Sequence, residues 1–284
     1  MIYVSSSCVK NQKIKDSVSM LREAGINEVE LSGGTQPYSE LEADLLEAKK
    51  QGVNFLIHNY FPPPPIPFVL NLASVNTQTR NASIEHCKRS IDLSRNLNAT
   101  KYGIHAGFFL DVGVHELGKK ITADKLVEEE KATHLFCEAF EELKEFAGED
   151  VKLYVENNVF SKANSESFGG VNPFMLTHKK AFEELSNILD FNLLLDVAHL
   201  KVSCGSLGLD FEDELTQLFP LSDYIHLSDN DGLSDSNRPI EEDSALLKQL
   251  GDLNWEGKTV TLEVYSELGL VKSSKENVKK LINA

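Results

Sequence analysis

An aspartate followed three residues later by a histidine is the first feature of the sequence that could do chemistry. Asp196 comes directly after the apolar run Leu193–Leu195, which is typical of a strand buried on both faces of a parallel sheet, and His199 follows. A carboxylate there is costly to desolvate unless a cation or a proton meets it, and Asp and neutral His both bind divalent metals. On their own, the two residues are explained at least as well by a helix cap at Asp196 and an ordinary, partly buried histidine.

Five other predicted strands carry a chargeable residue in the same place. Each is a short apolar run with a histidine or a glutamate at its end or next to it. Any one of these residues could be a satisfied polar group, but six in succession by accident is improbable. Carboxylates crowded at one place repel one another unless a cation lies between them. The pattern therefore predicts that a polyvalent metal binds at His58, His105, Glu156, Asp196, His226 and Glu263.

The elements that position these residues alternate between strands and helices along the chain. The predicted strands are Ile2–Ser5, Glu28–Leu31, Asn54–His58, Lys101–His105, Lys152–Glu156, the run ending on Asp196, Tyr224–Leu227 and Thr259–Glu263. The predicted helices cover about Gln12–Ala24, Ser39–Gln51, Asn81–Leu97, Ala123–Ala147, Leu176–Leu189, Phe211–Phe219, Asp243–Leu250 and Lys275–Ile282. Eight such units favour a single (β/α)₈ barrel of the α/β class over a doubly wound sheet. Residues 1–284 are therefore predicted to form one barrel domain, with the metal site at the C-terminal mouth of the strands.

The composition narrows the classes of partner. The formal net charge is −16 and no basic run is present, which makes nucleic acid an unfavourable partner. No apolar run approaches the roughly 20 residues of a membrane span, and the first residues lack the pattern of a secretion signal. A cytoplasmic location is expected, because the cysteines form no C-x-x-C pair or evident disulfide framework. They are Cys8, Cys87, Cys137 and Cys204.

The motifs at the strand ends resemble the metal-binding pattern of the xylose isomerase-like barrel superfamily. That group includes sugar isomerases and epimerases and the endonuclease IV type of DNA-repair enzyme. The resemblance covers nearly the whole chain and keeps the order of the motifs. It rests on His58, His105-Ala106-Gly107, Val155-Glu156-Asn157, Asp196-Val197-Ala198-His199, His226-Leu227-Ser228-Asp229 and Glu263.

The resemblance implies up to three metal positions. The ligands of the single-metal epimerases would correspond to Glu156, Asp196, His226 and Glu263. His58 and His105 would add a second ion on the Glu156 side, as in endonuclease IV. His199 and Asp235 would belong to the third position of that family, but Asn237 stands where a second histidine would be, and asparagine is a poor zinc ligand. One or two divalent ions per chain, zinc or manganese, are therefore expected.

By the same resemblance, Glu156 and Glu263 are the proton-transferring residues of a sugar or sugar-phosphate isomerase or epimerase. One glutamate would remove a proton next to a carbonyl while the other returns one. The alternative is a zinc-dependent phosphodiesterase of the endonuclease IV type, which His199 supports and Asn237 opposes. A barrel used for non-catalytic ligand binding or a lyase-type reaction is a third class. The expected partner is a small-molecule sugar or sugar phosphate, and the sequence sets no oligomeric state.

Four further residues near the strand ends are candidates for substrate binding, namely Tyr60, Asn158, Lys201 and Arg238. Lys201 and Arg238 are expected in the loops after the sixth and seventh strands. There they would hold a phosphate or sugar hydroxyls, although an exposed surface role fits equally well. Glu30, near the end of the second predicted strand, fits either a partner of a metal ligand or a helix cap.

Overall fold

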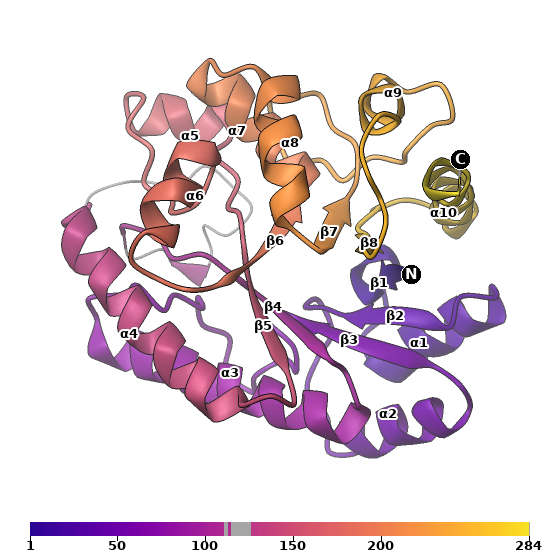
Figure 1. Cartoon of the computed structure of the whole chain (residues 1–284). Coiled ribbons are helices and arrows are strands. Elements are labelled where there is room, and N and C mark those ends of the chain that lie inside the picture. The colour runs from indigo at the N-terminus through magenta and orange to yellow at the C-terminus, as the bar shows by residue number, and fades with distance from the viewer. Residues whose placement is uncertain (111–112, 115–125, 284) are drawn as a thin grey trace.

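A closed barrel of parallel strands forms the centre of the computed structural model, which describes residues 1–110, 113–114 and 126–283 (Figure 1). The strands pair in chain order, and β8 pairs with β1 to close the ring. Their bounds are β1 Ile2–Ser5, β2 Glu28–Leu31, β3 Asn54–His58, β4 Lys101–His105, β5 Lys152–Glu156, β6 Asn192–Asp196, β7 Tyr224–Leu227 and β8 Thr259–Leu262. This confirms the predicted (β/α)₈ fold, and only β8 ends earlier than predicted, one residue before Glu263.

The strand register places the candidate ligands at one level. His105 is paired with Glu156 across β4 and β5, and Asp196 is paired with His226 across β6 and β7. Because all strands are parallel, their C-terminal ends open on the same side of the barrel. The register therefore brings these side chains to a common mouth.

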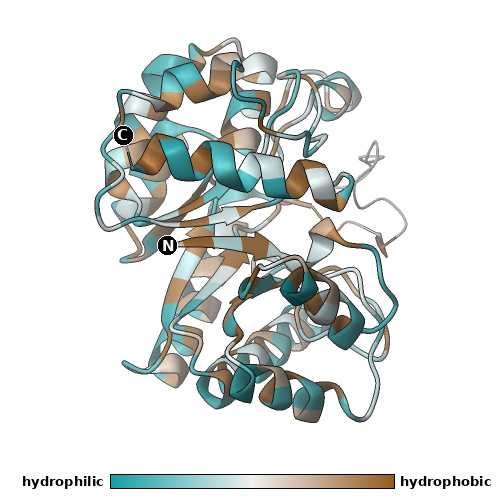
Figure 2. Ribbon diagram, turned by 90° about the vertical axis from the view of Figure 1, so that its right-hand side faces the viewer, coloured by the Kyte–Doolittle hydropathy of each residue, from teal (hydrophilic) through white to brown (hydrophobic). Residues whose placement is uncertain are grey.

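Helices surround the barrel, and the C-terminal helix lies beside the first strand (Figure 1). Their bounds are α1 Ile14–Glu23, α2 Leu41–Lys50, α3 Thr77–Leu97, α4 Glu129–Ala147, α5 Lys162–Ser167, α6 Lys179–Ser186, α7 Val197–Leu207, α8 Phe211–Leu218, α9 Ala245–Leu250 and α10 Leu268–Ile282. Hydrophilic and hydrophobic residues alternate along the helices, as expected of elements with one face on the barrel (Figure 2).

Two of these helices are absent from the sequence prediction. Helix α7 begins directly after Asp196, and most of its residues are buried, so it lacks the polar face by which a surface helix is recognised. Helix α5 has only six residues and lies between the strand predicted at 152–156 and the helix predicted at 176–189, where no element is predicted. Several predicted helix ends also shift. For example, α3 begins four residues early because the Asn76 side chain accepts hydrogen bonds from the backbone N–H groups of Gln78 and Thr79. Residues 123–125 of the helix predicted at 123–147 lie outside the described part of the chain.

The buried apolar residues of the described chain form three clusters. The largest lies between the barrel and the helices, and a small one consists of Leu110, Phe160, Phe168 and Phe174. The inner cluster, inside the barrel, consists of Tyr3, Leu56, Tyr154, Leu194 and Tyr224. Below this inner cluster, the base of the barrel is closed by paired charges. Above it lies the polar mouth. The inner cluster is therefore a floor under the candidate site.

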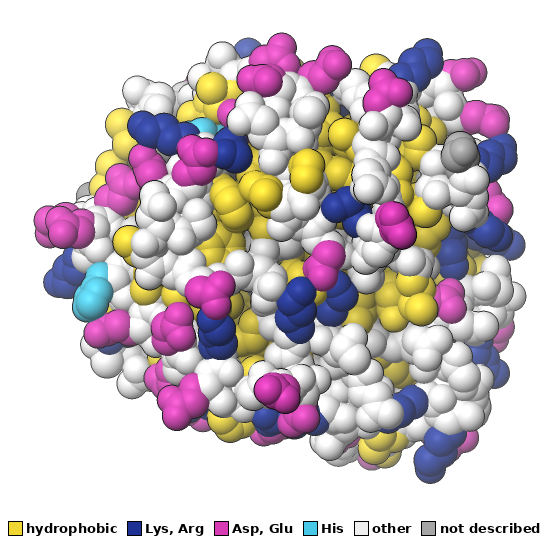
Figure 3. Space-filling view, viewed as in Figure 1, with side chains coloured by type: hydrophobic (Ala, Val, Ile, Leu, Met, Phe, Trp, Pro, Cys, Tyr) yellow, Lys and Arg dark blue, Asp and Glu magenta, His cyan; other side chains and the backbone are white. Residues whose placement is uncertain are grey.

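No helix of the described residues is long and apolar enough to cross a membrane. Acidic and basic side chains are interspersed over the face shown in Figure 3, so positive charge is not concentrated there. The prediction that the chain is one domain, like the expected cytoplasmic location, stays a prediction.

Candidate metal centre

Glu156, the last residue of β5, is the hub of the polar mouth. Its Oε2 lies 2.7 Å from Nε2 of His58, at the end of β3, and 3.1 Å from Nδ1 of His105, at the end of β4. Glu156 is fully buried and His58 nearly so, whereas His105 is partly exposed. These three residues form one group of side chains whose possible ligand atoms lie within 4.8 Å of one another.

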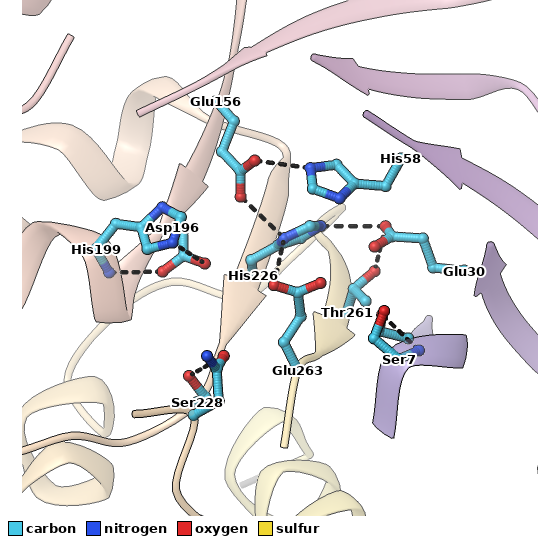
Figure 4. Close-up of polar contacts among 12 residues, drawn as sticks. Ser7, Glu30, His58, Glu156, Asp196, His199, His226, Ser228, Thr261 and Glu263 are labelled. Carbon is cyan, nitrogen blue, oxygen red and sulfur yellow. Dashed lines mark hydrogen bonds and ion pairs between the residues drawn. The ribbon is translucent and has the colours of Figure 1, made fainter. Parts of the chain in front are cut away.

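His226 lies at the centre of a second group (Figure 4). Its Nδ1 is 3.1 Å from Glu156 Oε1 and 3.6 Å from Glu263 Oε2, and its ring is fully buried. Together with Asp196, these residues offer four ligand atoms within 4.8 Å of one another. The two groups share Glu156, so these residues could hold one ion at either group, or one ion at each.

The donor set fits a divalent cation. Glu156 Oε1 and His226 Nδ1 are buried atoms without a hydrogen-bond partner, although they face each other. Buried polar atoms are normally hydrogen-bonded, and an ion bound between them would satisfy both. A set of carboxylate oxygens and imidazole nitrogens suits zinc or manganese.

The charges of the mouth are strongly interdependent. Burial raises the pKa of Glu156, but His105, His58 and His226 outweigh burial and hold that pKa well below its usual range. Burial conversely lowers the pKa of His226, and Glu30, Glu156 and Glu263 raise it well above its usual range. A metal ion and a proton thus compete for Nδ1 of His226, so metal affinity should fall as the pH falls.

Asp196 is the last residue of β6 and the N-terminal cap of α7. Its Oδ1 caps α7 by accepting a hydrogen bond of 2.7 Å from the His199 backbone N–H, so the helix-cap interpretation of the sequence is confirmed. The Asn157 side chain bonds both the N–H and the C=O of Asp196 and fixes its backbone. Burial raises the Asp196 pKa to about 7; His199 pulls it down, while Glu156 and Asp235 push it up. Capping therefore occupies one oxygen and leaves the other for a cation.

The predicted third position is arranged differently. His199 Nδ1 donates to the Asn157 carbonyl at 2.8 Å, which leaves Nε2 3.5 Å from Asp235 Oδ2 and 3.8 Å from Asp196 Oδ2. The amide of Asn237 lies 3.3 Å from the same Asp235 oxygen and donates to it. An N–H group therefore faces the place where a third ion would need a ligand. The roles of His199 and Asp235 as ligands stay predictions.

The four predicted substrate-binding residues are in different surroundings. Tyr60 lines the cavity at the mouth, and its hydroxyl accepts a hydrogen bond from the Phe68 backbone N–H. The buried Asn158 amide donates to three backbone carbonyls. Lys201 is on α7 rather than in the predicted loop, and its Nζ is 2.7 Å from both Asp229 Oδ1 and the Asn230 carbonyl. Arg238 is exposed and paired with Asp231. Of the four, Tyr60 is the one placed to meet a substrate, and all four roles stay predictions.

A cavity of about 750 Å³ opens above the two groups. Its lining includes His58, His105 and Glu263. Another part of the lining, here called the β1–β2 lining, comes from the segments after β1 and β2, where the sequence alone predicts no site residue. Hydroxyl groups follow both strands in the sequence, but the same residues are common in plain turns. The uncharged polar residues of the β1–β2 lining are Ser6, Ser7, Asn11, Gln12, Ser32 and Thr35.

Comparisons with known proteins agree with this architecture. A D-tagatose 3-epimerase-like protein superposes with a TM-score of 0.73 and 17% identity over 99% of this chain and 97% of that one. An L-ribulose 3-epimerase superposes with a TM-score of 0.69 and 13% identity over 99% of this chain and 94% of that one. Endonuclease IV from Thermus thermophilus superposes with a TM-score of 0.58 and 13% identity over 99% of this chain and 97% of that one. At these identities the likeness shows the fold alone. No curated protein matches the sequence.

A family model described as "Xylose isomerase-like TIM barrel" matches residues 18–283, which is most of the chain. The match spans seven of the eight strands, including each one that supplies a residue of the two ligand groups at the mouth. The protein belongs to the xylose isomerase-like TIM barrel family.

Proposed function

We propose that the protein is a divalent-metal-dependent isomerase or epimerase of a sugar or sugar phosphate, acting by proton transfer at the carbon next to a carbonyl. The observation that carries the proposal is the placement of two glutamates around one possible metal ligand. Glu156 and Glu263 lie 3.1 Å and 3.6 Å from the same nitrogen, Nδ1 of His226. Two proteins of similar fold, a D-tagatose 3-epimerase-like protein and an L-ribulose 3-epimerase, support the choice.

The metal would be held by Glu156, Asp196, His226 and Glu263. When bound, it would polarise a carbonyl and its neighbouring hydroxyl, which lowers the pKa of the proton on the adjoining carbon. Zinc and manganese both suit these ligands. Their chemistry in this role requires no redox change of the ion.

The two glutamates would move the proton. They come from β5 and from the residue after β8, which are not neighbouring strands, so their carboxylates can approach a substrate from different sides. The three histidines around Glu156 keep its pKa well below the usual range, against the effect of burial, and thus hold it as a carboxylate able to act as a base. Of the two glutamates, Glu263 is the one that lines the cavity. Removal by one glutamate and return by the other gives epimerisation, and return at the next carbon gives isomerisation.

The β1–β2 lining of the cavity suits a polyhydroxy compound. Ser7, Asn11, Gln12 and Thr35 can donate and accept hydrogen bonds with sugar hydroxyls. Among the described residues that line the cavity, Lys10 supplies the one ammonium group. A single phosphate could be met there, whereas a polyphosphate chain would find little positive charge.

The endonuclease IV type of activity is the second candidate. It is favoured by the contact of Glu156 with both His58 and His105, at 2.7 Å and 3.1 Å, a second ligand group that a single-metal epimerase does not require. It is opposed by the Asn237 amide facing Asp235 and by the net charge of −16. By the resemblance to that family, the repair-type reaction needs a third ion, and Asn237 stands where one of its ligands would be.

Hydrogen exchange with solvent tests the proposal. The metal-loaded protein in deuterated water should incorporate deuterium next to the carbonyl of at least one ketose or ketose phosphate in a panel of these compounds. Glu263→Gln should strongly lower the incorporation, since an amide has no comparable basicity. DNA with abasic sites, offered in parallel with zinc, should remain uncut. Efficient cutting of that DNA, with no exchange in any sugar, would reverse the order of the two candidates.

A further inference from the structure

Glu30 lies beneath the mouth and has no assigned role. It is the third residue of β2, and its side chain is fully buried inside the barrel. One carboxylate oxygen, Oε2, contacts three groups of β7 and β8: the Tyr224 hydroxyl, Thr261 Oγ1 at 2.9 Å and His226 Nε2 at 3.1 Å. Of the two roles left open for Glu30, the contact with His226 favours that of a partner to a metal ligand.

The contact with His226 decides what the other side of that ring can do. A carboxylate beside Nε2 favours a hydrogen on Nε2, because the carboxylate can only accept. A neutral imidazole with its hydrogen on Nε2 presents a lone pair at Nδ1. Nδ1 is the atom that faces Glu156 and Glu263 (Figure 4). Glu30 therefore selects the tautomer and the ring orientation in which His226 can bind a metal between the two glutamates.

Two neighbours hold the Glu30 carboxylate in this place. The hydroxyls of Tyr224 and Thr261 donate to the oxygen that accepts from His226. An ion bound directly at Oε2 would have to displace these donors. The contacts thus favour an indirect role for Glu30 over that of a ligand, although its Oε1 has no hydrogen-bond partner and Glu30 also lies within reach of His58, His226 and Glu263.

We propose that Glu30 is a positioning residue of the metal centre, which holds His226 with Nδ1 directed at the ion through a hydrogen bond from Nε2. The inference rests on the proposed function only in that both need a metal held by His226. Carboxylate partners of metal-bound histidines commonly contribute about 10- to 100-fold to metal affinity or activity. An effect of that size is expected here.

Titration of the metal-free protein with Co²⁺, followed by visible absorption, tests this role without any substrate. Glu30→Gln should raise the Kd for Co²⁺ about 10- to 100-fold, and the absorption bands at saturation should match those of the parent protein, since the ligand atoms are unchanged. The matched control is Glu28→Gln, the same change two residues earlier on β2, where the side chain faces Lys275 instead. This control should leave the Kd unchanged.

Four results would contradict the role. An unchanged Kd in Glu30→Gln would make Glu30 merely structural, and altered bands at saturation would make it a ligand. The same loss in Glu28→Gln would show a general effect of charge, and a parent protein that binds no Co²⁺ would show that the proposed metal centre does not exist.

If Glu30→Gln does not fold, Thr261→Val removes one donor from the same oxygen and should raise the Kd for Co²⁺ by about threefold, the effect of a weakened hydrogen bond. An unchanged Kd would then overturn the proposal. Normal Co²⁺ binding without hydrogen exchange in any sugar would refute the proposed reaction and leave the role of Glu30 standing.

Discussion

At the base of the barrel, two lysines share one aspartate. Lys101 Nζ lies 3.0 Å from Asp223 Oδ1 and 2.7 Å from the Tyr154 hydroxyl, and Lys152 Nζ lies 3.0 Å from Asp223 Oδ2. At the mouth, by contrast, three carboxylates of one ligand group, Glu156, Asp196 and Glu263, crowd around a single imidazole, and buried atoms lack hydrogen bonds. The difference separates charges that stabilise the fold from charges that are free to bind a further ion.

Tyr224 connects these two regions. Its hydroxyl donates to Glu30 below the mouth, and Lys101 Nζ lies 5.3 Å from the centre of its ring. Substitutions at the mouth and at the base should nevertheless affect different properties of the protein. Changes at the mouth should affect metal binding and catalysis, and changes at the base should affect the free energy of unfolding.

The largest effect is expected from Glu156→Gln. The substitution removes the carboxylate shared by both ligand groups and one of the two proposed proton carriers. Hydrogen exchange should fall by a factor of about 100 to 10,000, the usual contribution of a general base, and metal occupancy should fall with it. Both are measured on the purified variant, by exchange in deuterated water and by elemental analysis. Retention of exchange with this substitution would show that the glutamate is not a proton carrier.

His105→Ala should weaken metal binding without unfolding the barrel. Burial lowers the pKa of His105 to about 4, so at neutral pH it is an uncharged imidazole and a free ligand for an ion beside Glu156. Metal affinity, or substrate affinity if no second ion binds, should fall by about tenfold, with the melting temperature nearly unchanged. His134→Ala, on the exposed side of α4, is the matched control. A large fall in melting temperature at unchanged metal occupancy would show that His105 stabilises the fold and does not bind the metal.

Lys101→Met should destabilise the fold and leave metal binding unchanged. The substitution leaves Asp223 with Lys152 alone and removes the donor to the Tyr154 hydroxyl. The free energy of unfolding should fall by about 2 kcal/mol, measured by urea denaturation, while metal occupancy stays at the parent level. Lys152→Met, at a more exposed position, should cost less. Loss of the metal from Lys101→Met would show that the two ends of the barrel are not independent.

The smallest effect is expected from Asp223→Asn, and it should depend on pH. Burial opposes ionisation of Asp223, but Tyr154, Lys101 and Lys152 outweigh it and lower the pKa to about 2. A lowered pKa in the folded protein stabilises it above the ordinary pKa of the carboxyl, and this stabilisation is lost as the pH falls toward 2. Because Asp223 is half-exposed, the contribution at neutral pH should be only about 1 kcal/mol. The difference in unfolding free energy between parent and variant should therefore shrink between about pH 4 and pH 2, and a difference constant over this range would contradict the pairing.

The strands and their ends were predictable because buried parallel strands are short apolar runs, and a chargeable residue at the end of such a run is conspicuous. His58, Glu156 and His226 were found in this way, and the structure places them together. Helix α7 was missed because it is buried on most sides. The contacts of Glu30 were not predictable in detail, since they join residues that are 194 to 231 positions apart in the chain. The sequence therefore predicts which residues lie at the mouth, but which side chains contact one another depends on how the barrel closes.

We expect a metal ion to bind at the mouth of the barrel and none to bind at the base. Crystals grown with zinc or manganese and measured at the absorption edge of that metal would locate a bound ion. We expect an anomalous peak among Glu156, Asp196, His226 and Glu263, with a second peak beside His58 and His105 if two ions bind. A mouth without any peak, at metal concentrations that saturate ordinary binding sites, would contradict this expectation.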